Sequence, residues 1–130
     1  MKQLIAAFVL LFVIGCSKSR EELLTDNSCG EWRLEKMYTG NGSRVILNDR
    51  NRLYLVFNEN GIYELFCRKK GKKVHLGKSG ARAGSPKWSI NSSYKMTLSD
   101  FEDLQLLQLS EDTLAFESGR LAYFFTHRCR

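Results

Sequence analysis

Four cysteines and two histidines are the side chains of this chain with the most reactive chemistry. Cys16 directly follows an apolar N-terminal run, whereas Cys29, Cys67 and Cys129 are spread over the rest of the sequence. A thiol can carry a lipid, form a disulfide or bind zinc. No Cys-x-x-Cys pair and no Cys/His cluster has the spacing of a zinc site, so we expect no metal and no cofactor.

Catalytic chemistry has no recognisable motif in this sequence. His75 lies within a basic stretch and His127 lies near the C-terminus, and neither is flanked by a nucleophile motif. A pair such as Cys67 with His127 would have to be assembled by folding alone. We therefore expect a protein that is not an enzyme and has no catalytic residues.

The N-terminus has the pattern of an export signal. Lys2 supplies a positive charge, and an uncharged apolar run follows from Leu4 to Ile14. The run is shorter than the about 20 apolar residues that span a bilayer. The alternatives are an ordinary cleaved signal that ends near a cysteine, or an uncleaved anchor.

The sequence Val13-Ile14-Gly15-Cys16 resembles the lipobox of bacterial lipoproteins. In that motif the cysteine is acylated, with palmitate among its lipids, and becomes the new N-terminus. The resemblance implies a signal peptide over residues 1–15 and a lipid anchor on Cys16. It places the protein in the bacterial cell envelope, and we expect the outer membrane, with the leaflet left open.

Residues 16–28 are polar and charged, and we expect a tether with a helical turn at Glu21–Leu24. In a related class of lipoproteins, acidic residues shortly after the cysteine mark export to the cell surface. The pair Glu21-Glu22 resembles that signal only loosely, so surface exposure stays open.

Residues 29–130 predict a single all-β domain. Asn60-Gly61, between two β-rich runs, predicts a hairpin because both residues tolerate positive φ. The spacing predicts one antiparallel meander of about eight or nine short strands that closes into a barrel. The runs begin with the alternation at Trp32–Glu35 and continue at Leu53–Phe57, Ile62–Cys67, Val74–Leu76, Trp88–Ile90, Tyr94–Leu98, Leu104–Leu109, Thr113–Glu117 and Leu121–Cys129. Val45–Leu47 is a further short apolar piece.

The hairpin formed by Leu53–Phe57 and Ile62–Cys67 carries apolar residues on both of its faces. One face belongs to the core of a half-buried sheet, and the other would ordinarily be polar. We therefore expect a central hairpin whose outer face is covered by a loop, a helix or a partner.

Export would permit a disulfide bond. With Cys16 acylated, three thiols remain, which allows one bond and one free thiol. Cys29 precedes the first strand and Cys129 ends the last, and these strands are neighbours in a closed barrel. We predict a Cys29–Cys129 disulfide, worth about 4–5 kcal/mol in the chain-entropy estimate, with Cys67 free. The alternative is that all three thiols stay reduced.

The stretch from Arg68 to Lys87 contains eight cations and no acidic residue. Its positive field would attract an anionic envelope component, such as lipid head groups, lipopolysaccharide phosphates, acidic glycans or an acidic protein face. The alternative is a solvated loop, and a location outside the cytoplasm disfavours nucleic acid. The candidate anion-binding residues are Arg68, Lys69, Lys70, Lys72, Lys73, Lys78, Arg82 and Lys87.

Gly30-Glu31-Trp32 resembles the Gly-x-Trp start of lipocalins. The layout from Trp32 through the Asn60-Gly61 hairpin to the last aromatic strand resembles small lipocalin-like lipoproteins of the Bacteroidetes type. The resemblance covers roughly residues 29 to 129 and implies a lipocalin-like barrel. It also implies that a late arginine packs over Trp32 and closes the barrel by a cation–π contact, with Arg128 as the matching residue and Arg120 as the second candidate.

Small barrels can be filled by side chains or can hold one small ligand, and both readings apply here. We therefore expect a lipid-anchored, non-enzymatic envelope protein that binds a small apolar ligand or an envelope component. The alternative is an interaction subunit or periplasmic inhibitor that works through a protein–protein interface. The candidate pocket residues are Phe57, Leu65, Trp88, Phe116 and Phe125.

Overall fold

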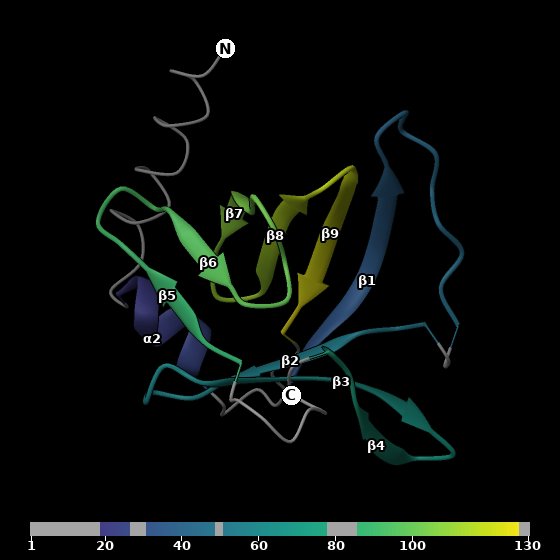
Figure 1. Ribbon diagram of the computed structural model, residues 1–130, viewed down its shortest axis with the longest axis horizontal. Helices are drawn as coiled ribbons and strands as arrows, with labels where there is room; N and C mark the ends of the chain where they lie inside the picture. The colour runs from purple at the N-terminus through teal and green to yellow at the C-terminus, as the bar shows by residue number, and fades with distance from the viewer. Residues whose placement is uncertain (1–18, 27–30, 49–50, 78–85, 128–130) are drawn as a thin grey trace.

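Nine strands and one short helix make up the part of the chain that the computed structural model describes, residues 19–26, 31–48, 51–77 and 86–127 (Figure 1). The prediction of an all-β fold is confirmed. The elements are α2 (Arg20–Thr25), β1 (Trp32–Thr39), β2 (Tyr54–Phe57), β3 (Tyr63–Lys69), β4 (Lys72–His75), β5 (Trp88–Ile90), β6 (Met96–Leu98), β7 (Gln105–Leu109), β8 (Thr113–Ser118) and β9 (Leu121–Thr126).

Seven of the strands form one antiparallel sheet in the order β4-β3-β2-β1-β9-β8-β7. The first strand lies in the middle because it pairs on one side with β2 and on the other with β9 (Figure 1). Arg33 lies opposite both Tyr54 and Thr126. The first and last strands are therefore side by side, and the predicted single meander is interrupted, because β5 and β6 pair only with each other in a separate sheet.

The hairpin of β5 and β6 is a separate two-stranded sheet that meets β3 near one end. An isolated bridge joins Ile62 to Lys87, and Tyr63 N donates to Pro86 O at 3.0 Å. Within the described ranges no ladder joins β6 to β7, and no closed barrel is detected. Closure of the barrel stays a prediction.

The hairpin between β2 and β3 is confirmed, but its turn differs from the expected one. Asn58 N donates to Ile62 O at 2.9 Å, and Gly61 alone has a positive φ, 83°. This is a three-residue loop that ends in a glycine bulge. The turn with two positive φ angles is instead Lys70-Gly71, at 53° and 78°, between β3 and β4.

The short apolar piece Val45–Leu47 is not a strand. Val45 N donates to Met37 O at 2.8 Å, but the segment forms no ladder beyond the isolated bridge of Arg44 to Tyr38. Ile46 is 85% exposed, whereas Leu47 is partly buried and packs against the core. A short apolar run forms a strand only where a neighbour can cover it.

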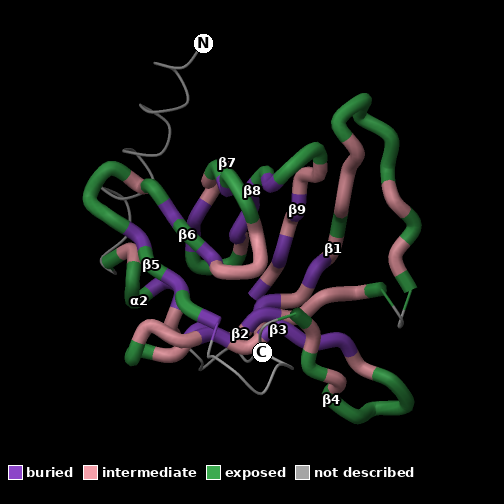
Figure 2. Tube along the Cα trace, viewed as in Figure 1, coloured by how far each residue is buried: buried purple, intermediate pink, exposed green. Residues whose placement is uncertain are grey.

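The core lies on the inner face of the sheet and is closed at one end by α2 (Figure 2). The predicted helical turn is confirmed as α2, which begins after Ser19, whose side chain accepts a hydrogen bond from Glu22 N at 3.2 Å. Leu23 and Leu24 are buried in the core, and Trp32 Nε1 donates to Leu24 O at 3.2 Å. Part of the expected tether is therefore packed structure.

No helix in the described residues has both the length and the apolar character needed to cross a membrane.

Candidate functional site

The five predicted pocket residues come together in the core. Phe57, Phe116 and Phe125 are fully buried, and Leu65 and Trp88 are nearly so. Their rings pack on one another: Phe57 meets Trp88 edge-to-face at 5.6 Å, and Phe116 stacks on Phe125 at 5.7 Å. These contacts support the reading in which side chains fill the interior.

Trp32 has partners that the sequence did not predict. Its indole ring stacks on the His127 ring, with centroids 4.3 Å apart. Arg120 lies at the opposite end of β1, beside Gly40, so the second candidate for the arginine over Trp32 is wrong. Arg128, the first candidate, lies outside the described residues. The pairing of Arg33 with Thr126 places the next residue, His127, beside Trp32.

Several other predicted site residues lie outside the described residues. They are the lipid-bearing Cys16, the disulfide candidates Cys29 and Cys129, and the cations Lys78 and Arg82. Cys67, by contrast, is described and carries a free thiol that is buried in β3, as expected.

The remaining predicted cations are concentrated on the hairpin of β3 and β4. The basic hairpin, as we call Arg68, Lys69, Lys70, Lys72 and Lys73, is tightly turned because Lys70-Gly71 reverses the chain in two residues. Lys69 lies directly opposite Lys72, and Arg68 directly opposite Lys73. Opposed side chains on an antiparallel pair have Cβ atoms about 4.5–5.5 Å apart, so both pairs repel.

Lys87 does not belong to this cluster. It is exposed and bridges to Ile62, whereas the tip of the basic hairpin begins at Lys69. Ile62 and Lys69 are seven residue steps of extended chain apart, which is roughly 23 Å. Sequence reasoning grouped Lys87 with the hairpin because it counted charges along the chain.

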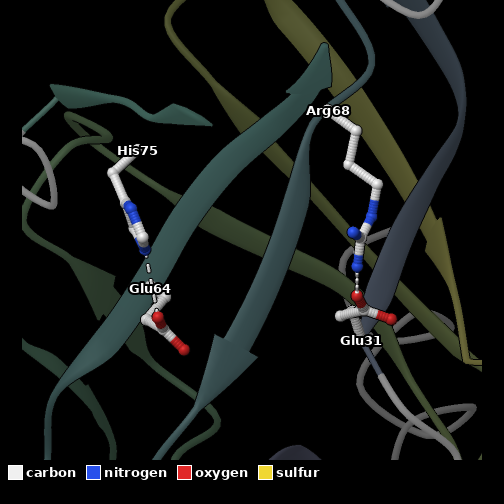
Figure 3. A network of polar contacts seen from close by, with 4 residues as sticks. All are labelled: Glu31, Glu64, Arg68 and His75. Atoms are coloured by element: carbon white, nitrogen blue, oxygen red, sulfur yellow. Dashed lines mark hydrogen bonds and ion pairs between the residues drawn. The ribbon is translucent and has the colours of Figure 1, made fainter. Parts of the chain in front are cut away.

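Two cations of the basic hairpin are held by their neighbours. Arg68 forms an ion pair with Glu31 (Figure 3), and its guanidinium lies 5.4 Å from the ring centre of Tyr54. Burial raises the pKa of Glu31, but its backbone hydrogen bond and Arg68 outweigh this and leave the pKa below its usual value. Lys73 Nζ lies 4.7 Å from the ring centre of Phe66. Arg68 and Lys73 therefore help to order the site.

The outer face of β2–β4 is covered in part by these same side chains. Phe66 lies between Tyr54 and His75 in the cross-strand register, and its ring stacks on Tyr54 at 5.4 Å. It is fully buried although it points away from the core cluster. His75 Nε2 lies 3.1 Å from Glu64 Oε1 beside it (Figure 3). The second apolar face that the sequence predicted is thus an aromatic strip beneath charged side chains.

Lys69, Lys70 and Lys72 are exposed, and none of them takes part in an ion pair recorded within the described ranges. They form the tip of the basic hairpin, which is the part available to an anion. Their arrangement can bind phosphate or carboxylate groups through charge-assisted hydrogen bonds. In the described part of the chain, no group of three or more His, Cys, Asp or Glu residues could hold a metal ion.

A second surface feature, which sequence reasoning missed, is an open groove of about 920 Å³. It lies where the end of β1 meets the β8–β9 turn. The sequence feature that could have indicated this groove is a pair of glycine-containing turns, at Gly40–Gly42 and at Gly119. These turns place small residues opposite one another. It is lined by Thr39, Gly40, Asn41, Gly42, Glu117, Gly119, Arg120, Leu121 and Ala122.

No protein-family model matches this chain, and neither the search of curated proteins nor the search of solved structures found a match.

Proposed function

We propose that this chain is a lipid-anchored, non-enzymatic protein of the bacterial cell envelope that binds an anionic envelope component through its basic hairpin. The observation that carries the proposal is the tip formed by Lys69, Lys70 and Lys72, three exposed cations without an ion pair among the described residues. The lipobox-like Val13-Ile14-Gly15-Cys16 supports the anchor and the location.

Repulsion within the basic hairpin supports binding of an anion. Like charges directly opposite each other destabilise a strand pair, and this hairpin has two such pairs, Lys69 with Lys72 and Arg68 with Lys73. A bound phosphate or carboxylate would neutralise that repulsion. The Arg68–Lys73 pair already has the carboxylate of Glu31, whereas the sequence from Leu65 to Gly77 supplies no acidic residue for Lys69 and Lys72.

The lipocalin-like barrel is part of the same proposal. The pairing of β1 with β9 and the bridge of Ile62 to Lys87 support a barrel, whose closure would require β6 to pair with β7. The packed rings of the interior direct the search for a ligand to the outer surface. Of the two expected ligands, a small apolar molecule is therefore less favoured than an anionic envelope component.

The test measures binding of inorganic polyphosphate and of purified lipopolysaccharide to the full chain by fluorescence anisotropy. We expect the triple variant Lys69→Gln, Lys70→Gln and Lys72→Gln to weaken binding about tenfold or more, since it removes the cations of the site. Raising the salt concentration should weaken binding to the unmodified chain in the same direction.

The matched control removes the same charge from other exposed lysines, by Lys36→Gln, Lys87→Gln and Lys95→Gln. A specific site predicts that this variant binds nearly as well as the unmodified chain. Equal losses in the two triple variants would show that net charge alone attracts the polyanion, and the proposal would then fail.

A second reading of the same lysines concerns the sheet edge. β4 is an edge strand of the seven-stranded sheet, and lysines on an edge prevent another chain from adding to it. That reading predicts that the hairpin triple variant aggregates, detected by light scattering, while polyphosphate binding by its remaining monomer is unchanged.

A further inference from the structure

The docking of α2 shortens the chain that is free to move between the lipid and the domain. Leu24 is fully buried and Leu23 nearly so, and both belong to the core cluster. Trp32 Nε1 donates to Leu24 O, and the Arg20 guanidinium lies 5.2 Å from the ring centre of Tyr94. The helix is therefore fixed to β1, to β2 and to the β5–β6 turn.

Only Ser17 and Lys18 lie between the lipid-bearing Cys16 and Ser19, where the docked structure begins. At full extension, the three residue steps from Cys16 to Ser19 span about 11 Å. If the tether were free as far as Glu31, its fifteen steps would reach about 50 Å. Docking of α2 thus removes most of the reach that the sequence alone suggests.

We infer that the end of the domain that carries α2 rests on the membrane that holds the Cys16 lipid, with Arg20, Tyr94 and Lys95 at the lipid surface. The inference rests on acylation of Cys16, which belongs to the proposed function. The occupant of this surface is the lipid head-group layer, because the tether begins beside it and is too short to hold it far away.

The side chains at this end suit a lipid–water interface. A tyrosine combines an apolar ring with a polar hydroxyl, and arginine and lysine can place a charge at head groups while their stems stay in apolar surroundings. Tyr94 is held in a left-handed conformation at φ 59°, which is unusual for an aromatic residue. Asn91 Oδ1 accepts from Ser93 N and from Lys95 N, both at 2.9 Å, and fixes the turn.

The basic hairpin lies at the other end of the molecule. Figure 1 shows α2 and the β3–β4 turn at opposite ends of the view, and β3 alone extends about 20 Å from Tyr63 to Lys69. With α2 against the membrane, Lys69, Lys70 and Lys72 face away from it. The anion that they bind is then a component or a polymer of the adjoining compartment. It is not a head group of the anchoring membrane.

The test places a photo-crosslinking phenylalanine analogue at Tyr94 or at Tyr38 in the full acylated chain. Both tyrosines are half-buried, and Tyr38 lies near the end of β1 away from α2, which makes it a matched control. The variants are illuminated in native envelope membranes, and phospholipid adducts are quantified by mass spectrometry. We expect several-fold more adduct from position 94 than from position 38.

Three outcomes separate this inference from the proposed function. Equal or reversed adduct yields on a chain whose Cys16 carries its lipid would overturn the orientation and leave the anchor intact. A chain without a lipid on Cys16 would overturn the anchor and the orientation together. A flexible insertion of ten glycine and serine residues between Ser17 and Lys18 should lower the yield at position 94 to that at position 38, and an unchanged yield would contradict the role of the short tether.

Discussion

Lys70 occupies a backbone conformation that glycine or asparagine usually fills. Its φ is 53°, and it precedes Gly71 at 78°, which together form the two-residue turn between β3 and β4. Such turns prefer Asn-Gly because both residues need positive φ. A lysine in this position costs stability of about 1 kcal/mol. The presence of a strained lysine at the tip of the basic hairpin motivates the hypothesis that its charge has a role.

The variant Lys70→Gly should therefore be more stable and bind less well. We expect the free energy of unfolding in urea to rise by about 0.5–1 kcal/mol, because glycine accepts positive φ without strain. Affinity for polyphosphate should fall, since the charge is lost. The control Lys70→Ala removes the same charge but keeps Cβ, so it should lose affinity without gaining stability. A less stable glycine variant would contradict this account.

Tyr63 connects the start of β3 to the loop after β6. Its hydroxyl donates to Asp100 Oδ2 at 2.5 Å and accepts from Asp100 N at 2.9 Å. Burial, together with the hydrogen bond to Asp100, raises the pKa of Tyr63 well above that of a free tyrosine. The folded chain therefore holds this proton more tightly than the unfolded chain does.

Stability should consequently fall as the pH rises above about 10, where the unfolded tyrosine loses its proton and the folded one keeps it. Below that pH the contribution of Tyr63 is fully present. The measurement is urea unfolding at a series of alkaline pH values. Tyr63→Phe should be less stable at neutral pH and show a shallower alkaline decline than the unmodified chain.

At the scale of single elements, the sequence predicted those elements that depend on residues close together in the chain. The Asn60-Gly61 hairpin and the helical turn at Glu21–Leu24 follow from residues within a few positions of one another, and both are confirmed. The type of turn was not predictable, because a bulge at Gly61 depends on how β2 and β3 align. Val45–Leu47 is apolar but forms no strand, and its sequence contains no information about whether a neighbouring strand pairs with it.

The docking of α2 is likewise a tertiary property, and it can be tested directly. Leu24→Ala should lower the free energy of unfolding by about 2–4 kcal/mol, because Leu24 is fully buried and its removal leaves a cavity. The same variant should be cleaved by a protease between α2 and β1 faster than the unmodified chain. Glu22→Ala, an exposed position of the same helix, serves as the control and should change stability by less than about 0.5 kcal/mol.

At the scale of the whole molecule, the central strands of the seven-stranded sheet are paired on both sides and its edge strands on one side only. β1 has strand neighbours on both sides, whereas β4 and β7 each pair on one side only in the seven-stranded sheet. Alternating apolar residues predicted most strands, but closure depends on how the β5–β6 hairpin meets β7. No short stretch of sequence encodes that contact. For the candidate site, the high density of positive charge was predictable from the sequence. The separation of Lys87 from the basic hairpin was not, because it depends on the tertiary arrangement.

Hydrogen exchange should report this arrangement. We expect the amides of β1 and β9 to exchange most slowly, near the rate set by global unfolding, since both strands are paired on each side. The amides of β7 that point away from β8 should exchange orders of magnitude faster. Equal protection along both edges of β7 would instead show that a ladder joins it to β6 and that the barrel is closed in solution.

The position of β1 beside β9 also determines when this domain can fold. The register joins Arg33 to Thr126, so the central ladder of β1 with β9 forms only after residue 126 has been made. Pairings so distant in sequence form slowly, because a long loop must close before any contact stabilises it. A chain that leaves the ribosome N-terminus first therefore lacks the β9 partner of its central strand until residue 126 has been made. If the chain is exported, as we propose, such a delay keeps the polypeptide unfolded, which is the form that a narrow translocation channel accepts.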